Sequence, residues 1–103
     1  MDHTLIQKFL AEIIGTFIFL GVIITVVNDK SSLMNSFKIG LALTIAIVFF
    51  GSVSGGNFNP AVSFMLYMNN KLNAQELAVY IIAQLIGASL AYYSFMTIIT
   101  PNL

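Results

Sequence analysis

The sequence SGGNFNPAV, at residues 54–62, interrupts a chain that is otherwise strongly apolar. Its first part disfavours a continuous helix, because glycine lowers helix propensity and a proline pushes the preceding residue out of the α region. Its second part favours a new helix, because asparagine is a good N-cap and proline is accepted at the first helical position. We therefore predict a break in the backbone and a helix that begins at Pro60.

The helix that begins at Pro60 is expected to be short. Polar residues 69–71 end it after roughly ten residues, which is about 15 Å at the helical rise. The hydrocarbon core of a bilayer is about 30 Å thick, so a helix of this length reaches only halfway across. The pattern is typical of a re-entrant element that lines a pore.

Composition places the chain in a membrane. Of 103 residues, 58% are hydrophobic and 8% are charged, whereas a soluble domain has about 25% charged residues. We predict an integral, multi-pass membrane protein with a single domain over residues 1–103 and the lipid bilayer as its surroundings. The net charge of zero and the lack of a basic patch argue against nucleic-acid binding.

Catalytic chemistry is not expected. The chain has no cysteine, which excludes disulfides, thiolate nucleophiles and cysteine-ligated metals. Its one histidine, His3, is expected to be solvated near the N-terminus. With no acid–base pair either, we predict no enzyme activity, no metal site and no cofactor. Residues 1–4 lack the features of a secretory signal, so the first apolar stretch is expected to remain as a span.

Three apolar stretches approach the roughly twenty residues that a membrane helix needs: 9–27, 39–53 and 77–99. Residues 28–32 and 69–75 are predicted to be polar turns, and residues 33–38 a short linker. Asn73 and Glu76 have the spacing of a capping box at the start of the third span. The predicted fold class is an all-α membrane protein with three transmembrane helices and one re-entrant half-helix.

Two polar residues lie within the predicted spans. Glu12 allows two interpretations: an interfacial carboxylate near a helix end, or a buried acceptor that holds non-helical backbone. Gln84 is expected to face protein, because a buried amide needs a partner. Around Gln84, small residues recur at Ala83, Gly87 and Ala91, which predicts close packing against another helix. Tyr80 is expected to be an interfacial anchor.

These residues together resemble a known family. Residues 55–62 resemble the Asn-Pro-Ala signature loop of the aquaporin and glycerol-channel family, the major intrinsic proteins. Residues 11–17 resemble the first-helix motif of that family, with its buried glutamate. Residues 40–42 and 51–56 resemble the second helix, and Tyr80 with residues 83–88 resembles the third. The order and spacing match over nearly the whole chain.

The resemblance implies a passive channel for water or small neutral solutes that needs a second half. Members of the family have two inverted halves whose half-helices meet at the midplane, and this sequence resembles the first half only. The lysines divide evenly, with Lys8 and Lys71 on one side and Lys30 and Lys38 on the other, so there is little positive-inside bias. We expect an inverted homodimer, or dimers of dimers.

Other assemblies stay open at this point. One is a parallel oligomer, and another is a truncated, inactive product. A third is a non-conducting adaptor that pairs with a full-length channel through its face of small residues, Ala83, Gly87 and Ala91.

The resemblance also implies which residues line the pore. They are Gly55, Gly56, Asn57, Asn59, Pro60, Ala61, Val62, Ile39 and Ile47, while Glu12 and Gln84 are expected to support the loop. The N-terminus of a half-helix carries roughly half a positive charge, which opposes cations at the midplane. The family has a filter arginine just after its second Asn-Pro-Ala motif, whereas Val62 follows the motif here, and Asn57 replaces a common histidine. We predict apolar constrictions and weak discrimination against glycerol-like solutes.

Overall fold

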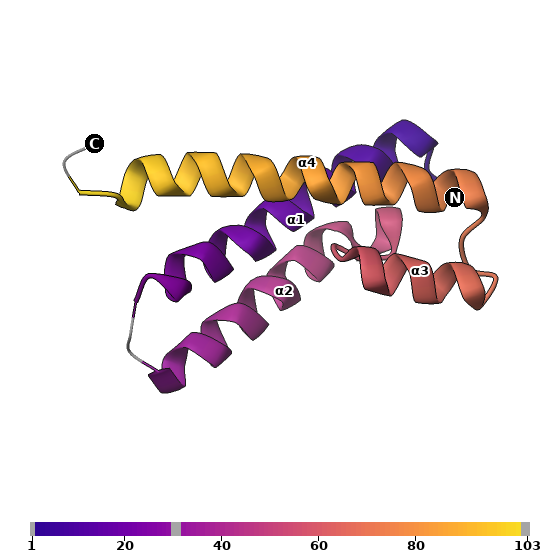
Figure 1. Ribbon diagram of the computed structural model, residues 1–103. Coiled ribbons are helices and arrows are strands. Elements are labelled where there is room, and N and C mark those ends of the chain that lie inside the picture. Colours follow the sequence, from indigo (N-terminus) through magenta and orange to yellow (C-terminus); the bar gives the residue numbers. More distant parts are fainter. Residues whose placement is uncertain (1, 30–31, 102–103) are drawn as a thin grey trace.

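Three long helices and one short helix form the protein in the computed structural model, which describes residues 2–29 and 32–101 (Figure 1). They are α1 (Leu5–Val27), α2 (Ser32–Ser54), α3 (Pro60–Met68) and α4 (Ala74–Ile99). The three long helices are long and apolar enough to cross a membrane. The described residues contain no strand, so the predicted all-α fold class with three spans is confirmed.

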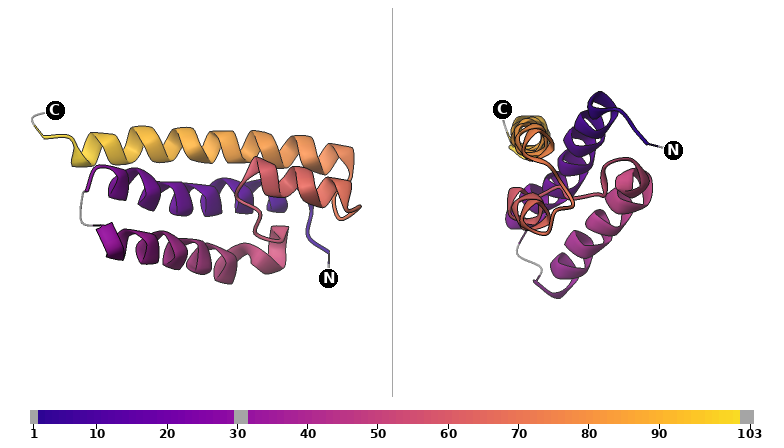
Figure 2. Two further views of the ribbon diagram at one scale, coloured as in Figure 1. Left: turned by 60° about the horizontal axis from the view of Figure 1, so that its bottom comes forward. Right: turned by 90° about the vertical axis from the view of Figure 1, so that its right-hand side faces the viewer.

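α1 lies at the centre of the arrangement and contacts both α2 and α4. α1 and α4 run in the same direction (Figure 1). Lys8 contacts Glu76 near the N-termini of the two helices, and Asn28 contacts Met96 near their C-termini. α2 runs back along α1, and α3 packs beside the first part of α4 (Figure 2). Among the described residues, the helices at the end of the bundle away from α3 are therefore α1, α2 and α4.

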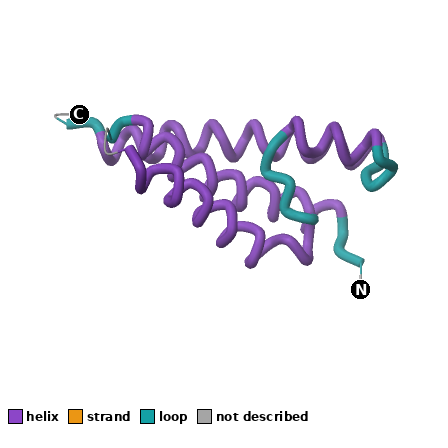
Figure 3. Tube along the Cα trace, turned by 90° about the horizontal axis from the view of Figure 1, so that it is seen from below, coloured by secondary structure: helices purple, strands orange, loops and turns teal. Residues whose placement is uncertain are grey.

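The half-helix has the predicted start and length. Asn59 is its N-cap, with Oδ1 accepting a hydrogen bond from the Ala61 amide at 2.8 Å. Its nine residues span about 14 Å. The turn after α3 lies at one end of the bundle, whereas loop 55–59 before it lies away from the ends (Figure 3). The N-terminus of α3 is thus placed part-way along the bundle and not at one of its ends.

The predicted capping box at the start of α4 is also confirmed. Asn73 Oδ1 accepts from the Glu76 amide at 2.7 Å, and Glu76 Oε1 accepts from the Asn73 amide at 3.0 Å. A second capping box, between Thr4 and Gln7, starts α1 earlier than the hydrophobic pattern suggested. α1 therefore gains one helical turn before Phe9, and Glu12 lies well inside the helix.

The predicted linker at residues 33–38 is wrong, because α2 begins at Ser32. Nothing in these residues breaks a helix, since they contain neither glycine nor proline. Lys38 is accommodated at the side of the span because its long apolar stem lets the ammonium group reach the polar end. Part of the predicted turn at 28–32 lies outside the described residues.

The small-residue face of α4 packs against α1 within the chain. Ala83, Gly87 and Ala91 are all buried. A Cβ on Gly87 would lie 2.6 Å from the Ile13 carbonyl oxygen, so the two backbones approach closely there. The predicted packing role is confirmed. The hypothesis that this face pairs with a separate channel is wrong, because α1 already covers it.

Candidate functional site

A buried carboxylate organises the loop before α3. Glu12 is 0% exposed and accepts four hydrogen bonds, two at each oxygen. Oε2 accepts from Ser54 Oγ at 2.6 Å and from the Asn57 amide at 3.1 Å. Oε1 accepts from the Phe58 amide at 2.8 Å and from Gln84 Nε2 at 2.9 Å. Of the two interpretations of Glu12, the structure shows the buried acceptor.

These contacts provide hydrogen-bond acceptors for backbone amides that the break in the helix leaves without partners. The amides of residues 57 and 58 are turned away from helical partners, and unpaired amides at membrane depth cost several kcal/mol each. One helical carboxylate satisfies both. On the other side of the break, the Ser54 carbonyl accepts a hydrogen bond from the Tyr80 hydroxyl at 2.7 Å. The loop is thereby attached to both α1 and α4.

Tyr80 does not act as the predicted interfacial anchor. Its side chain is 1% exposed and its hydroxyl donates to the end of α2. The buried carbonyl at the break needs a donor, and Tyr80 lies on the face of α4 that meets it. The predicted interfacial role rested on the position of Tyr80 near one end of the span. Position along a span carries no information about the direction of the side chain.

Asn57 faces inwards, away from the surface of this half. Its side chain is 5% exposed, and Nδ2 donates to Ser63 Oγ at 2.8 Å. Ser63 Oγ also accepts from Gln84 Nε2 at 2.8 Å. The side chain of Asn57 thus braces the loop against α3 and α4, and its place in a pore lining stays a prediction. Sequence reasoning missed Ser63, although it is the one polar residue within the apolar half-helix.

The loop backbone requires left-handed conformations. Gly55 and Gly56 have φ angles of 87° and 65°, which glycine adopts without steric cost. Phe58 has a φ of 55°, which is unfavourable for a bulky residue and needs support from its surroundings. Its ring is buried against Gly15 of α1, where any added Cβ would collide with it. Phe58 therefore anchors the loop immediately before Asn59.

The signature residues lie at the surface of this half. Asn59, Pro60 and Ala61 are exposed, and Val62 is half-buried. Asn59 Oδ1 is held by the Ala61 amide, whereas no residue in the described part of the chain accepts a hydrogen bond from Asn59 Nδ2. The site therefore presents an oriented amide donor at the N-terminus of α3.

The two predicted constriction residues are separated along α2. The side chain of Ile47 lies next to loop 55–59, within 3.2 Å of where a Cβ on Gly56 would be. Ile39 lies eight residues earlier, which is about 12 Å along the helix axis. The structure therefore brings Ile47 to the loop but leaves Ile39 in the half of the bundle that α3 does not reach.

Comparison with known proteins identifies the family. The family model for major intrinsic proteins matches residues 1–103. The chain belongs to the major intrinsic protein family. This confirms the resemblance seen in the sequence, and with its three membrane-capable helices this major intrinsic protein is an integral membrane protein.

Its relatives include proteins named as a glycerol uptake facilitator, an aquaporin and a nodulin. The chain is 42% identical over 87 residues to "Glycerol uptake facilitator protein-like 6" of Lactiplantibacillus plantarum, covering 82% of this chain and 40% of that protein. It is 34% identical over 125 residues to "Probable aquaporin AqpM" of Archaeoglobus fulgidus, covering 98% and 51%. Nodulin-26 of Glycine max is 37% identical over 93 residues, covering 84% and 34%. The chain spans about half the length, or less, of these relatives.

Proposed function

We propose that this chain supplies one half of a transmembrane pore for water or small neutral solutes, and that it performs no catalysis. The observation that carries the proposal is the exposed N-terminus of α3, where Asn59 presents Nδ2 without a partner among the described residues. The relatives named as a glycerol uptake facilitator and a probable aquaporin support the same class of solute.

The proposed selectivity follows from the charges and dipoles at the site. A solute oxygen accepts from Asn59 Nδ2, and exposed backbone at Gly55 offers carbonyl acceptors for solute hydrogens. The aligned peptides of α3 place roughly half a positive charge at this N-terminus, which opposes the passage of cations. Val62 and Ile47 add apolar surface beside it. We propose single-file passage of small neutral molecules with weak discrimination by size.

The second half of the pore must come from elsewhere, because α3 spans only about half of the bilayer. We propose a second copy of the chain in inverted orientation, with the two α3 N-termini facing each other at the midplane. The charges permit this arrangement. Lys8 and Lys71 line one polar pocket at one end of the bundle, whereas Lys38 lies beside Asp29 at the other. The predicted counterpart Lys30 lies outside the described residues.

Substituting Asn59 with aspartate is expected to lower solute flux about tenfold or more. Aspartate is an equally good N-cap, so α3 is retained. The donor Nδ2 is lost, however, and one hydrogen bond with its desolvation is worth about a factor of ten. The measurement is stopped-flow swelling of liposomes that contain the protein, with water and with glycerol gradients.

Asn73→Asp is the matched control, because Asn73 is also an exposed N-cap but starts α4 far from the loop. It is expected to leave the flux unchanged. If the wild-type protein conducts neither water nor glycerol above the background of protein-free liposomes, the channel proposal is wrong and a non-conducting role remains.

An inverted dimer predicts two orientations in the same membrane. A single cysteine at Asn70, which is exposed in the turn after α3, uses the absence of native cysteine. In cell membranes, an impermeant maleimide is expected to label about half of the molecules from each side, since the lysines give little orientation bias. Detergent should make labelling complete. Labelling from one side only would rule out the inverted dimer while leaving a pore with a different second half possible.

A further inference from the structure

Two enclosed polar atoms in the seam between α1 and α4 have no hydrogen-bond partner among the described residues. They are Thr16 Oγ1 and Gln84 Oε1, and the two residues are 1% and 2% exposed. A third such atom, Asn35 Oδ1, belongs to α2. Enclosed polar atoms without a partner cost free energy, and in proteins most of them bond to protein or to an ordered water. Two of them in one seam point to a shared ligand.

The two atoms belong to consecutive layers of this seam. Gln84 contacts Glu12 of α1 through Nε2 at 2.9 Å. Thr16 follows Glu12 by four residues, which is about 6 Å along the helix axis. The Cβ of Thr16 lies 2.9 Å from the position of an added Cβ on Gly87, so Thr16 also faces α4. A molecule that makes two hydrogen bonds of about 2.8 Å spans up to about 5.6 Å, which is close to the spacing of the layers.

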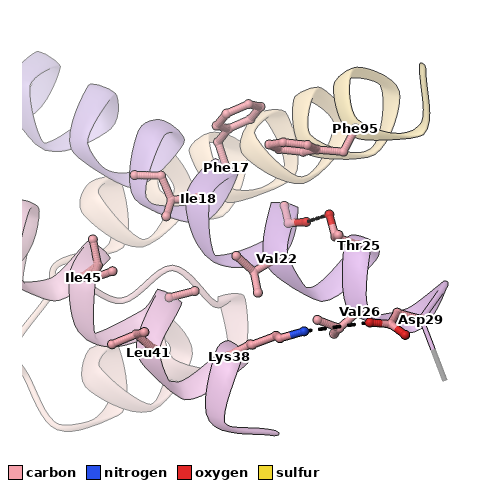
Figure 4. A pocket seen from close by; sticks show the side chains of 12 residues that line it. Phe17, Ile18, Val22, Thr25, Val26, Asp29, Lys38, Leu41, Ile45 and Phe95 are labelled. Atoms are coloured by element: carbon pink, nitrogen blue, oxygen red, sulfur yellow. Dashed lines mark hydrogen bonds and ion pairs between the residues drawn. The ribbon is translucent and has the colours of Figure 1, made fainter. Parts of the chain in front are cut away.

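Thr16 differs from the other threonines inside the described helices. Thr25 donates to the Gly21 carbonyl at 2.8 Å (Figure 4). Thr44 and Thr97 likewise donate to the carbonyls four residues earlier, at 2.8 Å and 2.6 Å. A threonine in a helix divides between the rotamer that makes this bond and one that does not. The hydroxyl of Thr16 does not make it, so it is directed away from the carbonyl of its own helix.

The hydrogen-bonding capacities of the two atoms select the ligand. Gln84 Oε1 can only accept, whereas the Thr16 hydroxyl can both donate and accept. The ligand must therefore donate to Gln84, which a metal cation cannot do. The neighbouring carboxylate, Glu12, does not favour a cation either, because each of its oxygens already accepts two hydrogen bonds. Water both donates and accepts, and it is the smallest molecule that can bond to two enclosed atoms.

We propose that one structural water binds in the seam, donating to Gln84 Oε1 and accepting from the Thr16 hydroxyl. A donor at Oε1 fixes the orientation of the Gln84 amide. Nε2 then keeps facing Glu12 Oε1 at 2.9 Å and Ser63 Oγ at 2.8 Å. Thr16 is thereby a positioning residue for the network that holds loop 55–59, although it contacts no residue of the loop through a hydrogen bond.

Thr16→Val tests this site, because valine has nearly the shape of threonine but no hydroxyl. We expect the folding equilibrium constant of the full chain to fall about tenfold, since the water loses one of its two partners. Hydrogen exchange at Gln84 Nε2 is expected to become faster. Thr25→Val is the control, because the Thr25 hydroxyl bonds only its own helix, and such bonds add little to stability. We expect a change of about twofold or less for it. Reversible unfolding in mixed detergent micelles and NMR measure these effects.

The sign of the effect decides between the alternatives. Higher stability of Thr16→Val would refute the proposal, because removing an unpaired buried hydroxyl is favourable. Changes of equal size in Thr16→Val and Thr25→Val would refute it as well, since the Thr16 hydroxyl would then bond its own helix. A crystal structure of the unsubstituted chain gives a second measurement if Thr16→Val does not fold. We expect density for one water between Thr16 Oγ1 and Gln84 Oε1, and its absence would overturn the proposal. Neither measurement depends on solute flux.

Discussion

Replacing Glu12 with glutamine is expected to destabilise the protein by about 2–4 kcal/mol, although the side chain keeps its size and shape. Each carboxylate oxygen accepts two hydrogen bonds, from Ser54 and Asn57 on one side and from Phe58 and Gln84 on the other. An amide has only one acceptor oxygen. Wherever its NH₂ group points, it meets two donors.

Rearrangement relieves only half of this conflict. The hydroxyl of Ser54 can rotate, and the amide of Gln84 can flip to present Oε1, which has no hydrogen-bond partner among the described residues. The backbone amides of Asn57 and Phe58 cannot turn in this way. One of them is left buried and unpaired in every arrangement, at a cost of about 1–3 kcal/mol, and the charge-assisted bonds are lost as well.

Reversible unfolding in mixed detergent micelles measures this effect, together with hydrogen exchange at the amides of Asn57 and Phe58. Glu76→Gln is the control. Glu76 closes a capping box, which glutamine also does, and loses only a partly exposed ion pair with Lys8. We expect Glu76→Gln to destabilise the protein by about 1 kcal/mol or less. Wild-type stability and wild-type amide protection in Glu12→Gln would show that the carboxylate does not hold the loop.

The half-helix was predictable because its signals are local. Two glycines, the capping Asn59 and Pro60 act within one turn of the residues that they affect. The start of α2 was not predictable from hydropathy. A hydropathy window that counts Lys38 as polar places the end of the span at this residue. The helix nevertheless continues to Ser32, because its backbone hydrogen bonds are internal and the long side chain of Lys38 reaches the polar end of the bundle.

The hydrogen-bond network could be predicted only in part. The sequence indicated that Glu12 and Gln84 need partners, but the choice of partner depends on where four separate segments meet. Asn57 is the clearest case. Its side chain turns inwards because Ser63, six residues later, comes within 2.8 Å once α3 has formed. A position in a loop motif does not contain that information, so the direction of this side chain could not be predicted.

Replacing Gly87 with alanine is expected to destabilise the protein by about 1–3 kcal/mol, through overpacking of the seam between α1 and α4. The added Cβ would lie 2.6 Å from the Ile13 carbonyl oxygen, 2.9 Å from Thr16 Cβ and 3.2 Å from the Phe17 amide nitrogen. Two of these neighbours are backbone atoms inside a helix. No rotamer change can relieve the contact, so the helices must separate.

Gly40→Ala provides the matched control for this substitution. Gly40 also lies inside a long helix, but no atom lies within 4 Å of the position of an added Cβ. Alanine has the higher helix propensity, by about 1 kcal/mol. We therefore expect Gly40→Ala to be neutral or stabilising in the same detergent unfolding measurement. An equal change in the free energy of unfolding for Gly87→Ala and Gly40→Ala would contradict the close backbone contact between α1 and α4.

The seam and the loop are coupled through a single turn of each helix. Gly87 follows Gln84 by three residues, and Thr16 follows Glu12 by four, so the overpacked contact lies next to the 2.9 Å bond between Gln84 and Glu12. Separation of α1 from α4 at Gly87 lengthens that bond as well. The double variant Glu12→Gln with Gly87→Ala should therefore lose less stability than the sum of the two single variants, because both disturb the same interaction. Strict additivity would mean that the helix seam and the loop are held independently.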